Sequence, residues 1–256
     1  MSKLPEKYQF LDLSDYGRSL GYFIATKLKN TSLTPIHVTT MFLITGFIAI
    51  GLLLKGYLIA SAFLLLLKSI LDAADGELAR LKKKPSYVGR YYDSISDLIL
   101  NFCFLLSLWY ITDISIIYMI ISFLAIQLQG TLYNYYYVIL RNSVKGDSTS
   151  RIFENTTPKA LKGESQLAVN IFYKIYCLLY IPFDKTIYYM DQNAVKSKPL
   201  PKWLMTLVSI YGLGFQLFIM ALMLVLKLQA FIIPFFIGYS VLIIIFIFIR
   251  RVLLKT

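Results

Sequence analysis

Six apolar stretches of about 20 residues each dominate this sequence and limit what the chain can fold into. They lie at roughly 38–56, 57–79, 94–112, 114–138, 204–226 and 229–249. A helix of that length spans the hydrocarbon core of a bilayer, where every backbone polar group needs an internal partner. Since 57% of all residues are hydrophobic, we predict an all-α polytopic membrane protein with six transmembrane helices.

The 26 Lys and Arg residues indicate how these helices are oriented. Cytoplasmic connections accumulate positive charge. All the basic residues fall on one side of the predicted topology except Lys55 and Lys227, on the opposite side, and Lys68, inside the second stretch. We therefore expect both termini on the cytoplasmic side of the cytoplasmic (inner) membrane. The net charge of +12 follows this topology, so we expect the bilayer as a partner and no nucleic acid.

The chain divides into an N-terminal cytoplasmic or interfacial segment, 1–35, and a six-helix transmembrane domain, 36–256. Within the first segment, residues 14–29 place apolar side chains at helical spacing, which predicts an amphipathic helix along the cytoplasmic interface. A further apolar segment, 167–183, is short and interrupted by Pro182. A seventh span there would move the basic C-terminus outside, so we predict an interfacial or partly buried helix.

Four aspartates lie on the cytoplasmic halves of the second and third stretches: Asp72, Asp75, Asp93 and Asp97. Ionisable groups in membrane helices are energetically expensive and therefore indicate function. The members of each pair are three or four residues apart and share one face of a helix. With the turn near Pro85 and a rise of about 1.5 Å per residue, both pairs lie roughly 12 to 20 Å from the turn. The four carboxylates are therefore expected to converge between two antiparallel helices.

Such a cluster repels itself unless cations neutralise it. Ligation by oxygen alone selects hard divalent ions such as Mg²⁺, Mn²⁺ or Ca²⁺, and two ions fit four carboxylates. Small residues between the pairs would let a phosphorylated ligand approach these ions, and the guanidinium of Arg80 suits a diphosphate. Each glycine alone is equally compatible with close helix packing. Arg80 alone also fits the positive-inside pattern.

Residues 72–97 read Asp72-x2-Asp75-Gly76-x2-Ala79-Arg80-x8-Gly89-x3-Asp93-x3-Asp97. At every fixed position this resembles the signature of the CDP-alcohol phosphotransferase (CDP-alcohol phosphatidyltransferase) family. The resemblance implies a phospholipid-biosynthetic transferase that moves a phosphate-linked alcohol group from a CDP-alcohol donor to an acceptor alcohol and releases CMP. One of the two alcohols would be a lipid, and the protein would be a homodimer.

The same resemblance implies roles for individual residues. Two divalent cations, Mg²⁺ or Mn²⁺, would be held by Asp72, Asp75, Asp93 and Asp97, and Asp97 would also be the catalytic general base. The pocket for CDP would be lined by Gly76, Ala79, Arg80 and Gly89. Family members often carry Thr-Pro-Asn at the start of the first span, whereas this chain has Thr34, Pro35 and Ile36. The single histidine, His37, is expected to be a structural residue at the interface.

The signature does not identify the two alcohols. The compact chain and the variant Asp75-Gly76-Glu77-Leu78-Ala79-Arg80 resemble prokaryotic phosphatidyltransferases, which favours CDP-diacylglycerol as the donor. The alternative is a CDP-choline or CDP-ethanolamine type of enzyme that acts on diacylglycerol or another lipid alcohol. A phosphorylated acceptor would need further cations near the metals, and the candidates are Arg141, Lys145 and Arg151.

Three features leave further alternatives open. The tyrosines at 133 and 135–137 fit either an interfacial belt or a pocket for a head group. Small residues such as Gly212, Gly214 and Gly238 leave room for packing between subunits. A divalent-cation transporter would also explain aspartates in membrane helices. It does not explain Gly76, Arg80 and Gly89 at their spacing.

Overall fold

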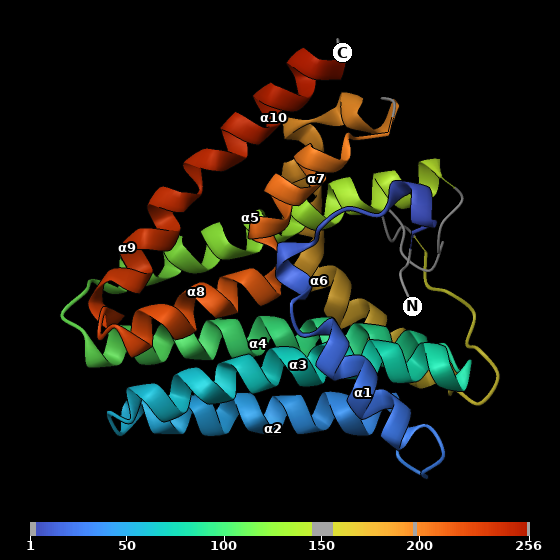
Figure 1. Cartoon of the computed structure of the whole chain (residues 1–256), viewed down its shortest axis with the longest axis horizontal. Coiled ribbons are helices and arrows are strands. Elements are labelled where there is room, and N and C mark those ends of the chain that lie inside the picture. The colour runs from blue at the N-terminus through green and yellow to red at the C-terminus, as the bar shows by residue number, and fades with distance from the viewer. Residues whose placement is uncertain (1–3, 145–155, 197–198, 255–256) are drawn as a thin grey trace.

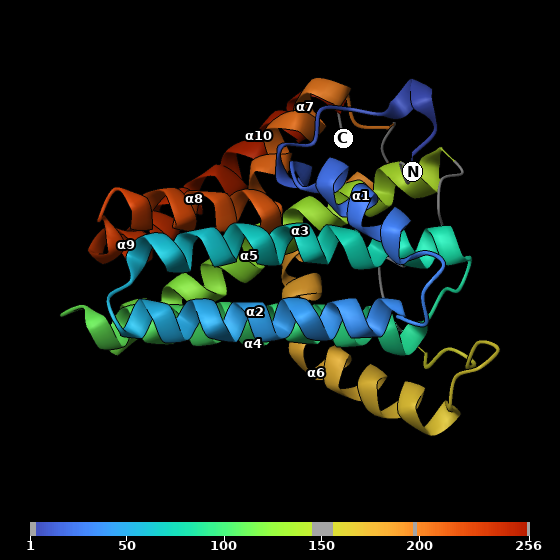
Figure 2. The same ribbon diagram turned by 60° about the horizontal axis from the view of Figure 1, so that its bottom comes forward.

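Three long helices form the centre of the molecule. The computed structural model describes residues 4–144, 156–196 and 199–254, and these contain helices and no strand. Helix α2 (Pro35–Leu54) packs against both α3 (Leu58–Lys82) and α4 (Tyr87–Ile111), while α3 and α4 hardly touch each other (Figures 1 and 2). The space between α3 and α4 is therefore available for a site.

Local signals set the ends of these helices. Helix α2 begins at Pro35 behind a capping box, in which the Thr34 backbone N–H donates to Nδ1 of His37 at 3.0 Å. The expected structural role of His37 is therefore confirmed. Helix α3 ends where Lys83 adopts a left-handed conformation (φ 50°), and Pro85 follows shortly after it.

Helix α1 (Arg18–Leu28) lies against α3, which confirms a helix within the predicted segment 14–29. The contact is close at Gly21, where an added Cβ would lie 2.9 Å from the backbone nitrogen of Ala74. Before α1, the short 3₁₀ helix Leu13–Asp15 (η2) packs on α8 (Leu213–Val225).

Two of the glycines that were candidates for packing between subunits instead make close contacts within this chain. A Cβ at Gly212 or Gly214 would overlap atoms of Ser14. The hypothesis that these two glycines serve packing between subunits is therefore wrong. Gly238 has no atom within 4 Å of its Cβ position and remains compatible with it.

The stretch predicted as one span at 204–226 is broken. Helix α7 (Lys202–Val208) runs into the 3₁₀ helix Ser209–Tyr211 (η4), and α8 follows Gly212 after a bend of 52°. Gly212 has extended backbone (φ −64°, ψ 147°), which interrupts the helical ladder. The last stretch forms α9 (Gln229–Tyr239) and α10 (Val241–Leu254).

The segment 167–183 is part of a longer helix than predicted. Helix α6 (Gln166–Met190) continues through Pro182, so the expected interruption at this residue is wrong. In Figures 1 and 2 it runs steeply across the direction of α2, α3 and α4. Its length and composition allow a membrane span, so the interfacial interpretation stays a prediction.

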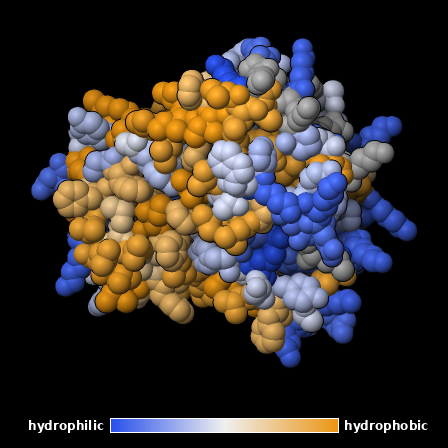
Figure 3. All heavy atoms as spheres, turned by 45° about the horizontal axis from the view of Figure 1, so that its top comes forward, coloured by the Kyte–Doolittle hydropathy of each residue, from blue (hydrophilic) through white to orange (hydrophobic). Residues whose placement is uncertain are grey.

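Length and composition identify several helices that can cross a bilayer. Among the described residues, five qualify by themselves: α2, α4, α5 (Ile116–Ser143), α6 and the α9–α10 unit. The bent pair of α7–η4 and α8 would be a sixth. The set differs from the prediction at two helices. It lacks α3, which carries Lys68, Asp72 and Asp75 within its apolar stretch, and it includes α6, which was predicted not to span the membrane. Apolar side chains cover much of the surface in Figure 3, and hydrophilic ones gather toward one end. The protein is an all-α polytopic membrane protein.

Candidate active site

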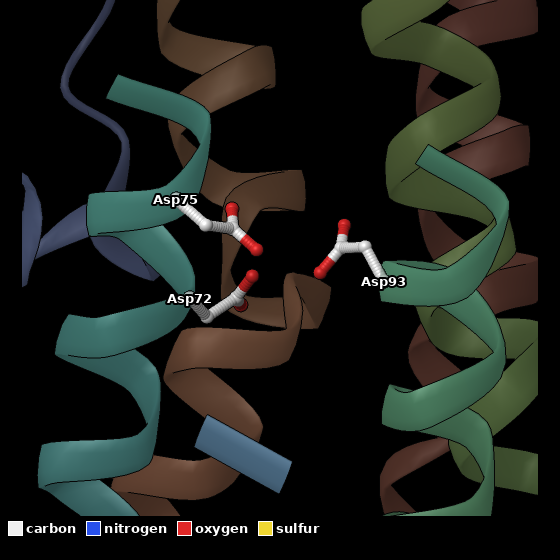
Figure 4. A group of neighbouring side chains, drawn as sticks. All are labelled: Asp72, Asp75 and Asp93. Atoms are coloured by element: carbon white, nitrogen blue, oxygen red, sulfur yellow. The ribbon is translucent and has the colours of Figure 1, made fainter. Parts of the chain in front are cut away.

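Three of the four predicted carboxylates meet in the gap between α3 and α4. Asp72 and Asp75 project from α3 toward Asp93 of α4 (Figure 4), and one oxygen of each lies within 4.8 Å of the others. The helical spacing of the sequence thus brings together the two α3 aspartates and the first α4 aspartate, as predicted.

The surroundings of this triad fit a hard divalent cation. The Thr39 hydroxyl, one turn into α2, donates to Oδ2 of Asp75 at 2.6 Å and fixes that carboxylate, which is 7% exposed. In contrast, Oδ1 of Asp93 is buried and has no hydrogen-bond partner among the described residues. Because a buried anionic oxygen without a partner is costly, and all the donors are carboxylates, the triad matches the ligand set of Mg²⁺ or Mn²⁺.

The fourth carboxylate, Asp97, has a different partner. It forms an ion pair with the ammonium of Lys68, which is 2% exposed and also lies 3.9 Å from Asp72. The structure groups three of the four carboxylates around one centre, and the role of Asp97 as a metal ligand stays a prediction. The sequence contained a signal for this pair, a lysine in an apolar stretch one turn before Asp72, which our sequence analysis had counted only as a charge inside a span.

All four residues predicted to contact CDP line one cavity. This turn cavity, of about 380 Å³, lies beside the connection between α3 and α4. Its lining includes Gly76, Ala79, Arg80 and Gly89 together with Asp75 and Asp93 of the triad. A ligand in the turn cavity would therefore reach the carboxylates.

Gly76 does not serve helix packing. A Cβ there would meet only the Arg80 guanidinium, at 3.6 Å, so the missing side chain leaves cavity space. Gly89 is tighter, since a Cβ would lie 3.1 Å from the Ser86 hydroxyl oxygen. Arg80 lines the cavity while its guanidinium pairs with Glu77 at 2.8 Å, so its orientation is already set without a ligand.

A second cavity opens on the other side of the triad. This N-terminal cavity, of about 290 Å³, is bounded by residues 12–18, α3, α5 and the start of α8. Both cavities share four lining residues, Asp75, Gly76, Arg80 and Asp93. The carboxylates therefore lie where two separate ligand spaces meet.

Glu164, which the sequence analysis did not single out, organises the start of α4. Its Oε1 accepts hydrogen bonds from the Ser86 hydroxyl at 2.6 Å and from the Val88 N–H at 2.9 Å. The Ser86 oxygen in turn accepts from the Gly89 N–H at 2.8 Å. Glu164 thus positions one wall of the turn cavity from a segment 76 to 78 residues further along the chain. The sequence around Glu164 has no local pattern that would predict such a contact.

Of the three residues considered for binding a phosphorylated acceptor, the structure describes one. Arg141 is 2% exposed, lies 5.8 Å from the centre of the Tyr137 ring, and does not line either cavity. Lys145 and Arg151 lie outside the described residues.

The tyrosine cluster serves two purposes. Tyr135 and Tyr136 are buried and donate to Asp191, which also pairs with the buried Arg250. Tyr133 and Tyr137 line the N-terminal cavity. An interfacial belt is therefore wrong for Tyr135 and Tyr136.

Comparison with known proteins agrees with the geometry. The sequence model of the family described as CDP-alcohol phosphatidyltransferase matches residues 33–248, and no curated protein gives a significant match. The match includes every residue of the triad and of the turn cavity. A chain with this match over most of its length belongs to the CDP-alcohol phosphatidyltransferase family.

Proposed function

We propose that this protein transfers a phosphatidyl group from CDP-diacylglycerol to a polar alcohol, with release of CMP. Family membership supports phosphotransfer from a CDP-alcohol to an alcohol. The donor is our own assignment and rests on the compact chain and its motif variant. The single observation that supports the proposal best is the junction of two cavities at the carboxylate triad, because group transfer needs two ligands that meet at one reacting centre.

We assign the nucleotide half of the donor to the turn cavity. Gly76, Ala79 and Gly89 leave room for it, and Arg80 offers its guanidinium to the diphosphate. The acceptor alcohol would approach through the N-terminal cavity. Its oxygen bonds to the phosphorus of the phosphatidyl group, the phosphorus–oxygen bond to CMP breaks, and the hydroxyl proton passes to Asp97 as the proposed general base.

Asp72, Asp75 and Asp93 would hold a divalent cation, Mg²⁺ or Mn²⁺. When bound, such an ion neutralises negative charge on a diphosphate and on a departing phosphate. Thr39 keeps Asp75 oriented toward the same centre. A second cation would need the carboxylate of Asp97, which forms an ion pair with Lys68 in this structure.

We also propose that the site opens to the cytoplasmic leaflet, that residues 1–35 form an interfacial segment ahead of the domain 36–256, and that the protein is a homodimer. The distribution of basic residues supports the first two assignments, and the resemblance to the family supports the third.

The test is CMP release by the protein purified in detergent, with CDP-diacylglycerol or CDP-choline and CDP-ethanolamine as donors. We expect release with CDP-diacylglycerol that requires Mg²⁺ or Mn²⁺ and stops with a chelator. Asp93→Asn should lower the rate by about 100-fold or more, and Asp113→Asn, an exposed aspartate outside both cavities, should not. Release only from CDP-choline or CDP-ethanolamine would overturn the donor assignment, and no release from any donor would overturn the proposed function.

A further inference from the structure

The N-terminal cavity has a distinct chemical lining. Apart from the triad, it exposes the acids Asp12, Asp15 and Glu77 and the bases Arg18 and Arg80. Arg18 pairs with Asp15, and Arg80 pairs with Glu77. Among the described residues, each base of this lining therefore already has an acidic partner. A phosphate group entering here would face a predominantly acidic surface, and like charges placed together oppose binding.

Asp12 has hydrogen bonds but no ion pair within the described part of the chain. Its carboxylate accepts from the Ser14 backbone N–H at 3.0 Å, from the Ser14 hydroxyl at 2.6 Å, and from the Tyr133 hydroxyl. All of these donors are neutral. They hold the carboxylate in place at the wall of the cavity, and among the described residues the cation that acts on its charge is Arg18, which already pairs with Asp15.

Aromatic rings lie next to this carboxylate. Tyr133 and Tyr137 both line the cavity, and their rings stack with centroids 5.8 Å apart and an interplanar angle of 16°. Ring faces attract cations, and aromatic rings beside a carboxylate are a favourable environment for an ammonium group. The exposed amide of Asn134 adds a neutral hydrogen-bonding group to the same lining.

The size of the cavity limits its ligand. At about 290 Å³ it lies at the lower end of small-molecule sites, which span roughly 300 to 1,000 Å³. This volume suits a small polar head group. Because the cavity shares Asp75 and Asp93 with the turn cavity, a hydroxyl group held there reaches the reacting centre.

We infer that the N-terminal cavity binds the polar alcohol of the reaction, and that this alcohol carries an ammonium group and no phosphate. The inference rests on the proposed function and names its substrate class. Asp12 recognises the ammonium group, with Tyr133 and Tyr137 beside it, and the hydroxyl group points toward the triad.

The experiment compares acceptors in the CMP-release assay with CDP-diacylglycerol. Ethanolamine, choline and serine carry the ammonium group. Glycerol and 3,3-dimethyl-1-butanol, a neutral analogue of choline, lack it, and glycerol 3-phosphate and inositol 1-phosphate carry phosphate. We expect at least one ammonium alcohol to be used, with kcat/KM about tenfold or more above its neutral analogue. Preference for a phosphorylated or a neutral alcohol would overturn the inference and leave the proposed function standing.

Variants link the preference to the cavity. Asp12→Asn keeps the shape and an acceptor oxygen, and should raise KM for the ammonium alcohol about tenfold, with a much smaller effect on the neutral analogue. Tyr133→Phe keeps the ring but removes the hydroxyl donor to Asp12, and should raise KM in the same direction. The exposed Asp113→Asn serves as the matched control. If Asp12→Asn is folded by size-exclusion chromatography and its KM is unchanged, Asp12 does not recognise the alcohol.

If CMP is released from CDP-ethanolamine or CDP-choline with diacylglycerol as acceptor, the same cavity would hold the ammonium alcohol as part of the donor. Asp12→Asn should then raise KM for the donor. Such a result would change the donor assignment and would still support the ligand class inferred for the cavity. No CMP release under either condition would contradict the proposed function itself, so the two failures are distinguishable.

Discussion

Gly76 provides the sharpest test of the site at the scale of one residue. We predict that Gly76→Ala lowers kcat/KM for the CDP-alcohol about tenfold or more, because the new methyl group enters space shared by both cavities. The fold should not suffer, since only the flexible Arg80 guanidinium lies within 4 Å of the new Cβ and alanine favours a helix by about 0.5–1 kcal/mol over glycine. CMP-release kinetics and thermal unfolding of the same preparation measure the two effects.

Gly21→Ala is the matched control for this prediction. Its Cβ would lie 2.9–3.0 Å from atoms of Ala73 and Ala74, two of them backbone atoms, so the contact between α1 and α3 must loosen. We expect a lower melting temperature for Gly21→Ala and an unchanged or higher one for Gly76→Ala. A loss of stability at Gly76 would instead show that this glycine serves packing.

The ion pair of Lys68 and Asp97 calls for a double-variant design. Asp97→Asn is expected to abolish turnover while CDP-alcohol binding is largely retained, as a general base requires. It also leaves Lys68, 2% exposed, with only the more distant carboxylate of Asp72 at 3.9 Å, and breaking a buried pair costs about 3–5 kcal/mol. Loss of turnover alone would therefore not distinguish a base from a structural ion pair.

The variant Lys68→Met/Asp97→Asn removes both charges. We predict that it regains much of the melting temperature lost by each single variant, because neither member of the Lys68–Asp97 pair is left as a buried charge without the other. If Asp97 is the base, the double variant stays inactive although it is folded. Recovery of CMP release in the double variant would contradict the base assignment and reduce Asp97 to a partner of Lys68.

At the residue scale, the sequence predicted which carboxylates meet in the site, but it did not predict the ion pair beside them. The spacing of Asp72, Asp75 and Asp93 follows from helix geometry, so the triad could be derived without a structure. The partner of Asp97 was not predicted. A lysine in an apolar stretch signals a buried acidic partner, but this contact crosses the gap between two helices, and the spacing within one helix does not specify which carboxylate it meets.

Among the elements, α4 depends on a distant segment for its first turn. Burial acts to raise the pKa of Glu164, but hydrogen bonds from the Ser86 hydroxyl and from the Val88 and Leu161 backbone N–H groups outweigh it, and the pKa lies below its usual value. The carboxylate therefore contributes stability above its unfolded-state pKa of about 4.3. That contribution is lost as the pH falls through the lowered folded-state pKa.

We predict that Glu164→Gln destabilises the protein at pH 7 by on the order of 1 kcal/mol, a value reduced for partial exposure. The difference in melting temperature between wild type and variant should shrink as the pH falls below about 4.3. Glu6→Gln, at an exposed residue, is the control and should show no such pH dependence. A difference that stays constant down to acidic pH would show that the carboxylate charge is not what holds the start of α4.

Element boundaries were predictable where local chemistry sets them. The start of α2 follows from Thr34 and Pro35, and the turn after α3 follows from Pro85. The break at Gly212 was not predicted, because hydropathy continues across it and the close approach of Ser14, from the other end of the chain, leaves no local pattern. Helix α6 continues through Pro182 although proline favours an interruption.

At the scale of the whole molecule, the connections between helices lie at two opposite ends of the helix bundle. The turns after α2, α4 and α8 lie together at one end in Figure 1, and the turn between α3 and α4 lies at the other. Lys55 and Lys227 belong to the first end, whereas Lys82, Lys83 and Lys84 belong to the second. The arrangement agrees with the sidedness inferred from charge, and it places the turn cavity at the basic end.

Cysteine labelling in intact cells tests the orientation of this molecule in its membrane. In a background with Cys103 and Cys177 replaced by alanine, we predict that Lys55→Cys and Lys227→Cys react with a membrane-impermeant maleimide added outside, because both positions are exposed in connections at the end that lacks the site. Lys84→Cys, exposed beside the turn cavity, should react only after permeabilisation, since positive-inside topology places it in the cytoplasm where the nucleotide donor is available. If Lys84→Cys were labelled in intact cells while Lys55→Cys and Lys227→Cys were protected, the orientation would be opposite to the predicted one. The site would then face away from the cytoplasm. Reaction of all three after permeabilisation ensures that a lack of labelling reports sidedness and not burial.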